Sequence, residues 1–181
     1  MKKLILAIAL FSSFTSNAQK FMTKTGSVDF SATSSIEKIE GANKSTACLL
    51  DAQTGVLNLV IQVKSFVFEK QLMQEHFNEN YMETETYPKA TFRGTLNNIK
   101  SIDFTKDGEY PTTTNGKLSI HGVTKDVQVK GKVIVKGNKP TLQASFSVLL
   151  SDYNIQIPGP VKDKISKDAR ISVNCALEPM K

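Results

Sequence analysis

Histidine and cysteine, which often act in catalysis, are scarce in this chain of 181 residues, which has two of each. No cysteine stands beside a histidine, and there is neither a G-x-S-x-G segment nor a glycine-rich phosphate loop. The basic residues form no block interleaved with aromatic residues, so nothing beyond the sign of the net charge supports nucleic-acid binding. These absences favour a binding protein over an enzyme, and we expect no metal and no cofactor.

The two histidines leave one chemical alternative open. His76 lies between Glu75 and Glu79, a spacing that could serve a metal site or a general base. Such pairs are common by chance, however. His121 stands at a predicted junction of strand and loop, where we expect its ring to hydrogen-bond loop backbone. A metal-dependent enzyme would need His76, His121 and a carboxylate within ligand distance of one another.

The N-terminus has the pattern of a secretory signal peptide. Two lysines precede the apolar run Leu4–Phe11, and a small-x-small sequence ends at Ala18. The run is roughly half the ~20 residues of a membrane span, so an anchor is the weaker interpretation. No later apolar run is long enough for a span. We expect cleavage near Ala18, a periplasmic or secreted protein, and a single domain over residues 19–181.

Removal of this peptide lowers the net charge from +6 to +4, because the remaining chain has 21 basic and 17 acidic residues. The lysines are spread along predicted strands, as in Lys125, Lys130, Lys132 and Lys136. This spacing indicates a solvated outer face with lysines that discourage pairing between sheet edges. Weak attraction to anionic lipid or polymer surfaces is the alternative.

The two cysteines, Cys48 and Cys175, lie in different predicted strands. In an oxidising compartment such a pair can form a disulfide. Each stands inside an apolar strand pattern rather than in a loop, which favours two small, buried hydrophobic side chains. Both interpretations remain open at this point.

Alternation of apolar and polar residues dominates the chain from Ser27 onward and is typical of strands with one buried face. About eight such strands follow one another, most of them joined by short turns. Turns are predicted at residues 41–44 and 52–55, with Gly55 at positive φ, and a compact loop at residues 121–125. The pattern predicts an all-β protein, an antiparallel up-and-down, lipocalin-like barrel. A β-sandwich is the alternative.

One segment, residues 69–84, departs from this alternation. Its apolar residues recur every three or four positions, and Glu, Gln, Met and Leu are frequent, which predicts a helix ended by Pro88. The helix follows the third strand and leads into the fourth, so it should cover one opening of the barrel. Leu72, Met73 and Phe77 should face inward, with Met82 joining them. The helix is either a lid over a ligand or a plug that completes the core.

The inward faces of the strands supply a predicted ligand-binding surface. Small residues such as Gly94 and Ala144 lie beside large ones there, which indicates either room for a ligand or interdigitated packing. The predicted lining, including the helix, consists of Phe30, Leu57, Leu59, Ile61, Val63, Leu72, Met73, Phe77, Phe92, Leu118, Ile120, Phe146 and Val148.

Two segments resemble a known family. Residues 116–127, G-K-L-S-I-H-G-V-T-K-D-V, are similar to the G-x-L-T-I-H-G-V-T-K-x-V segment of YceI-like domains. Phe77 in the predicted helix and residues 87–92, Y-P-K-A-T-F, resemble that family's L-x-x-x-x-F-F-x…Y-P-x-I-x-F region, with Asn78 in place of the second phenylalanine. The resemblance covers most of the chain after the predicted signal peptide.

The resemblance implies a lipocalin-like barrel, periplasmic export, and binding of a long polyisoprenoid or similar amphipathic lipid in the apolar interior. We therefore expect an exported protein that sequesters such a lipid. A prenyl quinone is one candidate ligand, and a homodimer is left open. The alternative is a stress-related or structural periplasmic module whose barrel is filled by its own side chains.

Overall fold

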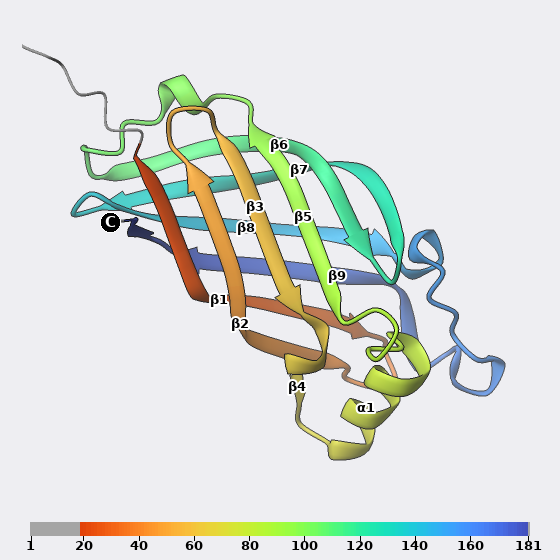
Figure 1. The fold of residues 1–181 in the computed structure, drawn as a ribbon. Coiled ribbons are helices and arrows are strands. Elements are labelled where there is room, and N and C mark those ends of the chain that lie inside the picture. Colours follow the sequence, from red (N-terminus) through yellow and green to blue (C-terminus); the bar gives the residue numbers. More distant parts are fainter. Residues whose placement is uncertain (1–18, 181) are drawn as a thin grey trace, which may run out of the picture.

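The chain folds into a closed barrel of eight antiparallel strands (Figure 1). The computed structural model describes residues 19–180, so the predicted signal peptide lies outside the described residues. Strand β1 hydrogen-bonds β2 along one side and β9 along the other, which closes the ring. The predicted up-and-down barrel is confirmed, and the alternative sandwich is wrong. The barrel strands are β1 (Lys20–Thr33), β2 (Glu40–Asp51), β3 (Val56–Gln62), β5 (Lys89–Leu96), β6 (Gly108–Ile120), β7 (Val123–Lys136), β8 (Lys139–Leu149) and β9 (Ile165–Ala176).

Short elements extend or connect these strands. β4 (Val67–Phe68) pairs with β2, and β10 (Glu178–Pro179) pairs with β1. Between β4 and β5 the chain forms α1 (Gln71–His76) and one π-helical turn, η2 (Phe77–Tyr81), at one end of the barrel (Figure 1). Within residues 19–180, no helix has the length and apolar character needed to cross a membrane. The remaining short helices are η1 (Val63–Ser65), η3 (Ile99–Ser101), η4 (Leu150–Tyr153) and η5 (Gly159–Val161).

Alternation places every second side chain of a strand inside the barrel. Leu59 of β3 lies opposite Phe92 of β5, and Phe92 lies opposite Leu118 of β6, so one inward row crosses three strands. All three side chains are buried. Their sequence neighbours Arg93 and Lys117 are exposed on the outer face. The alternation along each strand thus determines which side chains line the interior of the barrel.

The turn predicted at residues 41–44 is wrong, because these residues belong to β2. The connection between β1 and β2 lies instead at residues 34–39. A Cβ on Gly41 would lie 2.5 Å from Cε1 of Phe30, so a side chain at this position would collide with the aromatic ring. The glycine therefore permits close packing rather than a change of direction. β1 likewise starts at Lys20, before the predicted Ser27.

Residues with positive φ form the tight turns between strands. Gly55 (φ 76°) lies in the turn between β2 and β3, as predicted. His121 (φ 49°) and Gly122 (φ 74°) are the two residues between β6 and β7, the backbone pattern of a type I′ hairpin. The compact loop predicted at residues 121–125 is therefore wrong beyond Gly122, because Val123 already belongs to β7.

The predicted helix over residues 69–84 is shorter and less regular than expected. α1 spans 6 residues and continues into the π-helical turn, where the Met82 N–H donates to the Phe77 carbonyl at 2.9 Å. Glu83 then adopts a left-handed backbone (φ 42°) and ends the helical path. The chain thus leaves the helix five residues before Pro88, the predicted stop signal.

Cys48 and Cys175 are free thiols, and both are buried. β1 runs between the strands that carry them. A hydrogen bond with Cys175, together with burial, raises the pKa of the Cys48 thiol, which therefore stays protonated at neutral pH. The structure thus has two small buried side chains in contact rather than a disulfide.

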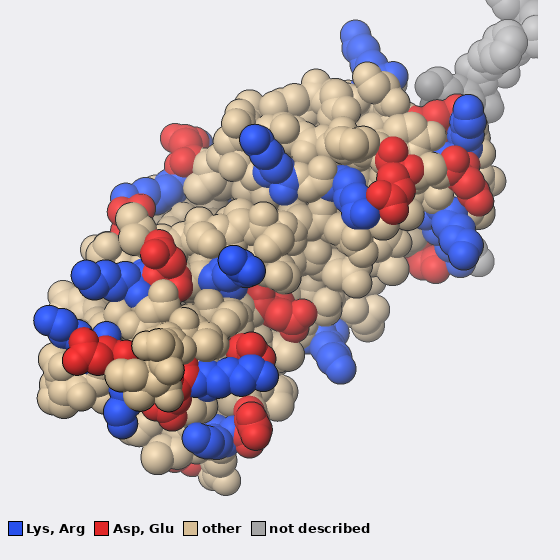
Figure 2. Space-filling view, turned by 180° about the vertical axis from the view of Figure 1, so that it is seen from behind, with Lys and Arg blue, Asp and Glu red and all other residues tan. Residues whose placement is uncertain are grey.

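Charges of both signs are interspersed on the face of the barrel that Figure 2 shows. Several lysines pair with carboxylates on other strands, as in Lys117 of β6 with Asp126 of the neighbouring β7 at 2.9 Å, and Lys139 of β8 with Glu178 of β10 at 2.8 Å. These side chains are exposed, so each pair contributes at most about 1 kcal/mol to stability. Lys125, Lys130 and Lys136 are exposed, as their spacing predicted, whereas Lys132 is only partly exposed.

Replacing Gly94 with alanine should destabilise the barrel. The added Cβ would lie 2.6 Å from the Asn115 carbonyl oxygen and 2.7 Å from Cζ of Phe92, so a strand or a core ring must move. We expect the free energy of unfolding to fall by about 1–3 kcal/mol, measured by chemical denaturation. Gly159→Ala is the matched control, because nothing lies within 4 Å of a Cβ there. Equal stability of the two variants would contradict this account of Gly94.

Candidate functional site

The barrel encloses a cavity of about 550 Å³. Every barrel strand except β2 contributes side chains to its wall, and α1 and η2 close one end. The wall contains all of the residues predicted to line a ligand site, namely Phe30, Leu57, Leu59, Ile61, Val63, Leu72, Met73, Phe77, Phe92, Leu118, Ile120, Phe146 and Val148. Their placement on one surface is a fact of the structure, and their contact with a ligand stays a prediction.

Small inward residues serve two different purposes. Ala32, Gly131 and Ala144 border the cavity and leave space within it. Gly94 instead accommodates the ring of Phe92, which lies 2.7 Å from where a Cβ would be. Both interpretations of the small residues thus hold, each at different positions, and the barrel is not filled by its own side chains.

Sequence reasoning missed the part of the wall that β9 supplies. Ala169, Ile171 and Val173 border the cavity from this strand. Closure of β9 onto β1 brings Ile171 opposite Phe30 and Val173 opposite Val28. The missing information was the neighbour of the last strand.

The lid, defined here as residues 69–87, packs on the barrel through a phenylalanine cluster. Phe77 of the lid stacks on Phe30 of β1 with ring centroids 5.2 Å apart. Phe66 and Phe68, which precede the lid, lie 5.6 Å and 4.9 Å from the Phe77 ring. All four rings border the cavity. Aromatic pairs at such distances contribute roughly 0.5–1.5 kcal/mol each beyond area burial, so this cluster is a major attachment of the lid.

The other lid residues that were predicted to face inward differ in how far they are buried. Met82 is buried, and Met73 packs against the core while remaining partly accessible. Leu72 was predicted to face inward; it borders the cavity, yet its side chain is 62% exposed. It lies at the rim because α1 is only 6 residues long and carries no buried residue.

Polar groups border the cavity near the lid and also along the strands, where Thr112, Thr114, Lys132 and Gln143 contribute from β6, β7 and β8. Glu37, Lys70, His76 and Lys164 contribute to the wall, and Lys70 lies 3.7 Å from Glu37 across the opening between the lid and the β1–β2 turn. A ligand with a polar head and an apolar tail would find partners for its head only where such side chains are available. The lid end offers three charged side chains, Glu37, Lys70 and Lys164, and so can hold a polar head.

Two tyrosines add neutral hydroxyl groups to this wall. Burial raises the pKa of the phenols of Tyr81 and Tyr153 above the ordinary value, and the neighbouring Asp152 contributes for Tyr153. Both phenols therefore stay protonated at neutral pH. The cavity presents them as uncharged hydrogen-bonding groups within an otherwise apolar surface.

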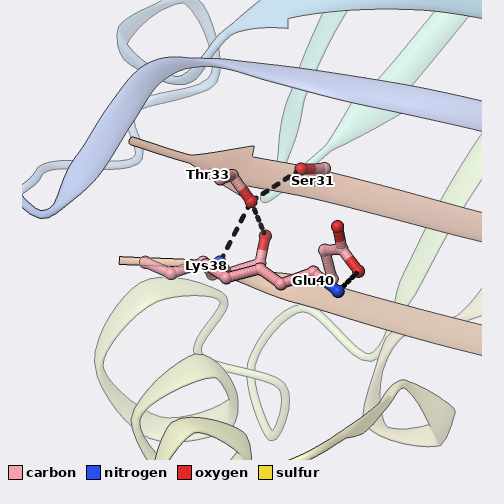
Figure 3. Close-up of polar contacts among 5 residues, drawn as sticks. Ser31, Thr33, Lys38 and Glu40 are labelled. Atoms are coloured by element: carbon pink, nitrogen blue, oxygen red, sulfur yellow. Dashed lines mark hydrogen bonds and ion pairs between the residues drawn. The ribbon is translucent and has the colours of Figure 1, made fainter. Parts of the chain in front are cut away.

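The β1–β2 turn supplies another part of the rim, and a threonine hydroxyl holds it in shape (Figure 3). The Thr33 hydroxyl oxygen accepts hydrogen bonds from the Ser31 hydroxyl at 2.9 Å and from the Ile39 N–H at 3.1 Å. Its own proton can go to the Ile39 carbonyl, 3.3 Å away. The turn thus positions Ile39 and Glu37 on the cavity wall.

His121 connects three segments at the lid end. Its Nδ1 lies 3.1 Å from the Tyr153 carbonyl oxygen, which is the backbone contact that its position predicted. Its Nε2 lies 2.7 Å from a carboxylate oxygen of Glu83 in the lid. The Tyr87 ring lies edge-on to the imidazole, with centroids 4.5 Å apart, and packs against Gly122. No local sequence pattern announces the contact with Glu83, because the two residues are 38 positions apart.

The histidines do not come together as a metal site. His76 Nδ1 lies 2.8 Å from Asn80 Nδ2 on the same helical segment. His121 is engaged by Glu83 and Tyr153, as described above. Over residues 19–180, no group of three or more His, Cys, Asp or Glu side chains is arranged to hold a metal ion.

Comparisons with known proteins agree with this architecture. Protein YceI of Escherichia coli O157:H7 is 34% identical over 101 residues, which cover 52% of this chain and 48% of that protein. The chain thus aligns with about half the length of the curated relatives it matches. A solved polyisoprenoid binding domain from Saccharophagus degradans superposes with a TM-score of 0.76 at 14% identity, covering 90% of this chain and 99% of that one. BcnA of Burkholderia cenocepacia gives 0.69 at 20% identity, covering 84% and 96%.

The structural matches concern the barrel as a whole, because at these identities they show the fold alone. The sequence assigns the family. The sequence model of the YceI-like domain family matches residues 12–177, which include the whole barrel. The chain therefore belongs to the YceI-like domain family.

Proposed function

We propose that this protein binds a long-chain amphipathic lipid or polyisoprenoid in the barrel cavity. The observation that carries the proposal is the apolar cavity of about 550 Å³, enclosed by strands and covered by the lid. A cavity of this size argues against the alternative of a barrel filled by its own side chains. The structural neighbour from Saccharophagus degradans, described as a polyisoprenoid binding domain, supports the same class of ligand.

The hydrophobic effect supplies the affinity in this proposal. Each buried CH₂ group of a ligand is worth about 0.8 kcal/mol, against the cost of ordering a flexible chain. Leu59, Phe92 and Leu118 form a continuous wall for an acyl or prenyl tail. The partly accessible Met73 at the lid can adapt its side chain to ligands of different shape.

The ligand is oriented with its tail inside the barrel and its head at the lid. Glu37, Lys70, His76 and Lys164 supply the polar partners there, together with the neutral phenols of Tyr81 and Tyr153. A prenyl quinone, whose head carries carbonyl or hydroxyl groups, is a candidate with this arrangement. The protein acts as a binding protein rather than an enzyme, and its predicted signal peptide supports a periplasmic or secreted location.

The first test of the proposal is the content of the native protein. The mature protein is purified from its native envelope fraction without detergent, extracted with organic solvent, and analysed by mass spectrometry. We expect one lipid of long acyl or prenyl type in stoichiometric amount. Absence of such a lipid, together with no rise in melting temperature on addition of prenyl quinones, would refute lipid binding.

Filling the cavity should weaken binding without unfolding the protein. Ala144→Leu adds three carbon atoms to the cavity wall, whereas Ser145→Leu adds a leucine to the outer face of the same strand. We expect the inward variant to bind a prenyl quinone at least about tenfold more weakly, a loss of about 1.4 kcal/mol. Fluorescence titration gives the affinity, and the outward variant should match the wild type. Equal binding by both variants would place the ligand elsewhere.

Charged substitutions in the lid distinguish a lid from a plug. Phe77→Asp disrupts the phenylalanine cluster, while Leu72→Asp changes an exposed side chain at the rim. If residues 69–87 form a lid, both variants remain folded by circular dichroism, and Phe77→Asp loses its lipid during purification. If Phe77→Asp unfolds instead, the segment is part of the core. Leu72→Asp should cost less than about 1 kcal/mol of stability in either case.

A further inference from the structure

His121 faces a hydrogen-bond acceptor with each of its ring nitrogens. Nδ1 faces a backbone carbonyl at 3.1 Å and Nε2 faces a carboxylate at 2.7 Å. Both oxygens accept hydrogen bonds, and a neutral imidazole carries only one N–H. The imidazolium form satisfies both contacts, whereas the neutral ring turns a lone pair toward one of the two oxygens.

We propose that His121 is a pH-sensitive latch that holds the lid on the barrel at acidic pH and releases it as the pH rises. The sign follows from the charge of the ring. Histidine side chains lose their proton between about pH 5 and pH 8. The closed lid therefore gains stability where the ring is protonated and loses it where the ring is neutral. The latch itself depends on the lid alone, and control of ligand exchange by it rests on the proposed function.

The position of the contact makes it effective as a latch. Glu83 directly follows Met82, and Tyr153 carries the backbone carbonyl that His121 reaches. Both Met82 and Tyr153 are buried and border the cavity. Loss of either hydrogen bond would thus weaken the attachment of one segment of the wall to the β6–β7 hairpin.

Backbone geometry also indicates that the contact is held under constraint. Glu83 and His121 both have positive φ, 42° and 49°, which is uncommon for residues other than glycine. The Tyr87 ring lies 2.6 Å from where a Cβ on Gly122 would be, so only glycine fits beside His121. The imidazole is well covered, with 10% of its side chain exposed, whereas 53% of the Glu83 side chain is exposed.

The other charged groups around the latch have partners of their own. Asp152 of η4 pairs with Lys125 of β7 at 3.2 Å. Glu85 of the lid pairs with Lys64 of η1 at 2.6 Å. Tyr87 presents its ring edge to His121, and the Tyr153 phenol has its pKa raised by burial. None of these pairs contains a histidine, so the imidazole of His121 is the one that this cluster contains.

Hydrogen exchange of the lid tests the latch without any ligand. Amide exchange of residues 77–87 is measured by mass spectrometry at about pH 5.5 and pH 8.5, on either side of the range in which histidine titrates, and corrected for intrinsic exchange rates. We expect protection of the wild-type lid to fall by about tenfold between the two, the scale of one charge-assisted hydrogen bond. A wild-type lid whose protection does not change with pH would overturn the proposal.

Two variants and one control assign the effect to the contact. Glu83→Gln keeps the shape of the side chain and can donate to a neutral imidazole, and His121→Asn suits a left-handed backbone while removing the titrating ring. Both should abolish the pH dependence of lid protection. Glu178→Gln removes a carboxylate from the Lys139 pair, far along the chain from the lid, and should behave like the wild type. Retention of the pH dependence in Glu83→Gln would overturn the latch, even if His121→Asn fails to fold.

Ligand exchange is measured separately with a fluorescent apolar probe, N-phenyl-1-naphthylamine. Its dissociation from the wild type should be faster at the higher pH, and the difference should vanish in Glu83→Gln. If the probe does not bind at all while lid protection still depends on pH, the proposed function fails and the latch stands. If the probe binds and lid protection is independent of pH, the latch fails and the proposed function stands.

Discussion

Hydrogen bonding of β1 to two different strands is the constraint on which this structure depends. β1 pairs with β2 at one edge and with β9 at the other, so the first and last long strands of the chain meet. A sheet that closes in this way has no free edge, and its inward side chains converge from all directions. The apolar wall is therefore a cavity rather than an exposed face. Its lining by side chains from opposite sides of the barrel follows from this closure.

The lid is attached mainly by side-chain contacts rather than by backbone hydrogen bonds. Barrel strands are joined by regular backbone ladders, whereas residues 69–87 depend largely on side chains: the phenylalanine cluster around Phe77, the Lys64–Glu85 pair, and the contact of Glu83 with His121. Side-chain contacts can break individually without opening the ladder. The molecule thus combines a wall joined by backbone hydrogen bonds with an end attached chiefly by side chains.

Features of the fold that depend on local side-chain direction could be predicted from the sequence. The alternation of residues in each strand marked the cavity wall correctly, including Leu59, Phe92 and Phe146, because direction along a strand depends only on position. Features that depend on distant partners could not. Gly41 looked like a turn residue, yet it lies in a strand because the ring of Phe30 covers it. The contact between Glu83 and His121 has no local signature. His121 nevertheless lies within residues 116–127, and Glu83 lies between Phe77 and residues 87–92, the segments that carry the family resemblance.

The closed ladder also has a consequence for how such sequences diverge. Ladder hydrogen bonds come from the backbone and are nearly indifferent to side-chain identity, provided that the period of two is kept. This explains how a barrel with 14% sequence identity can superpose on the present one with a TM-score of 0.76. Interior residues can be substituted one by one while the barrel fold is retained. One scaffold can thereby be adapted during evolution to apolar molecules of different length and shape.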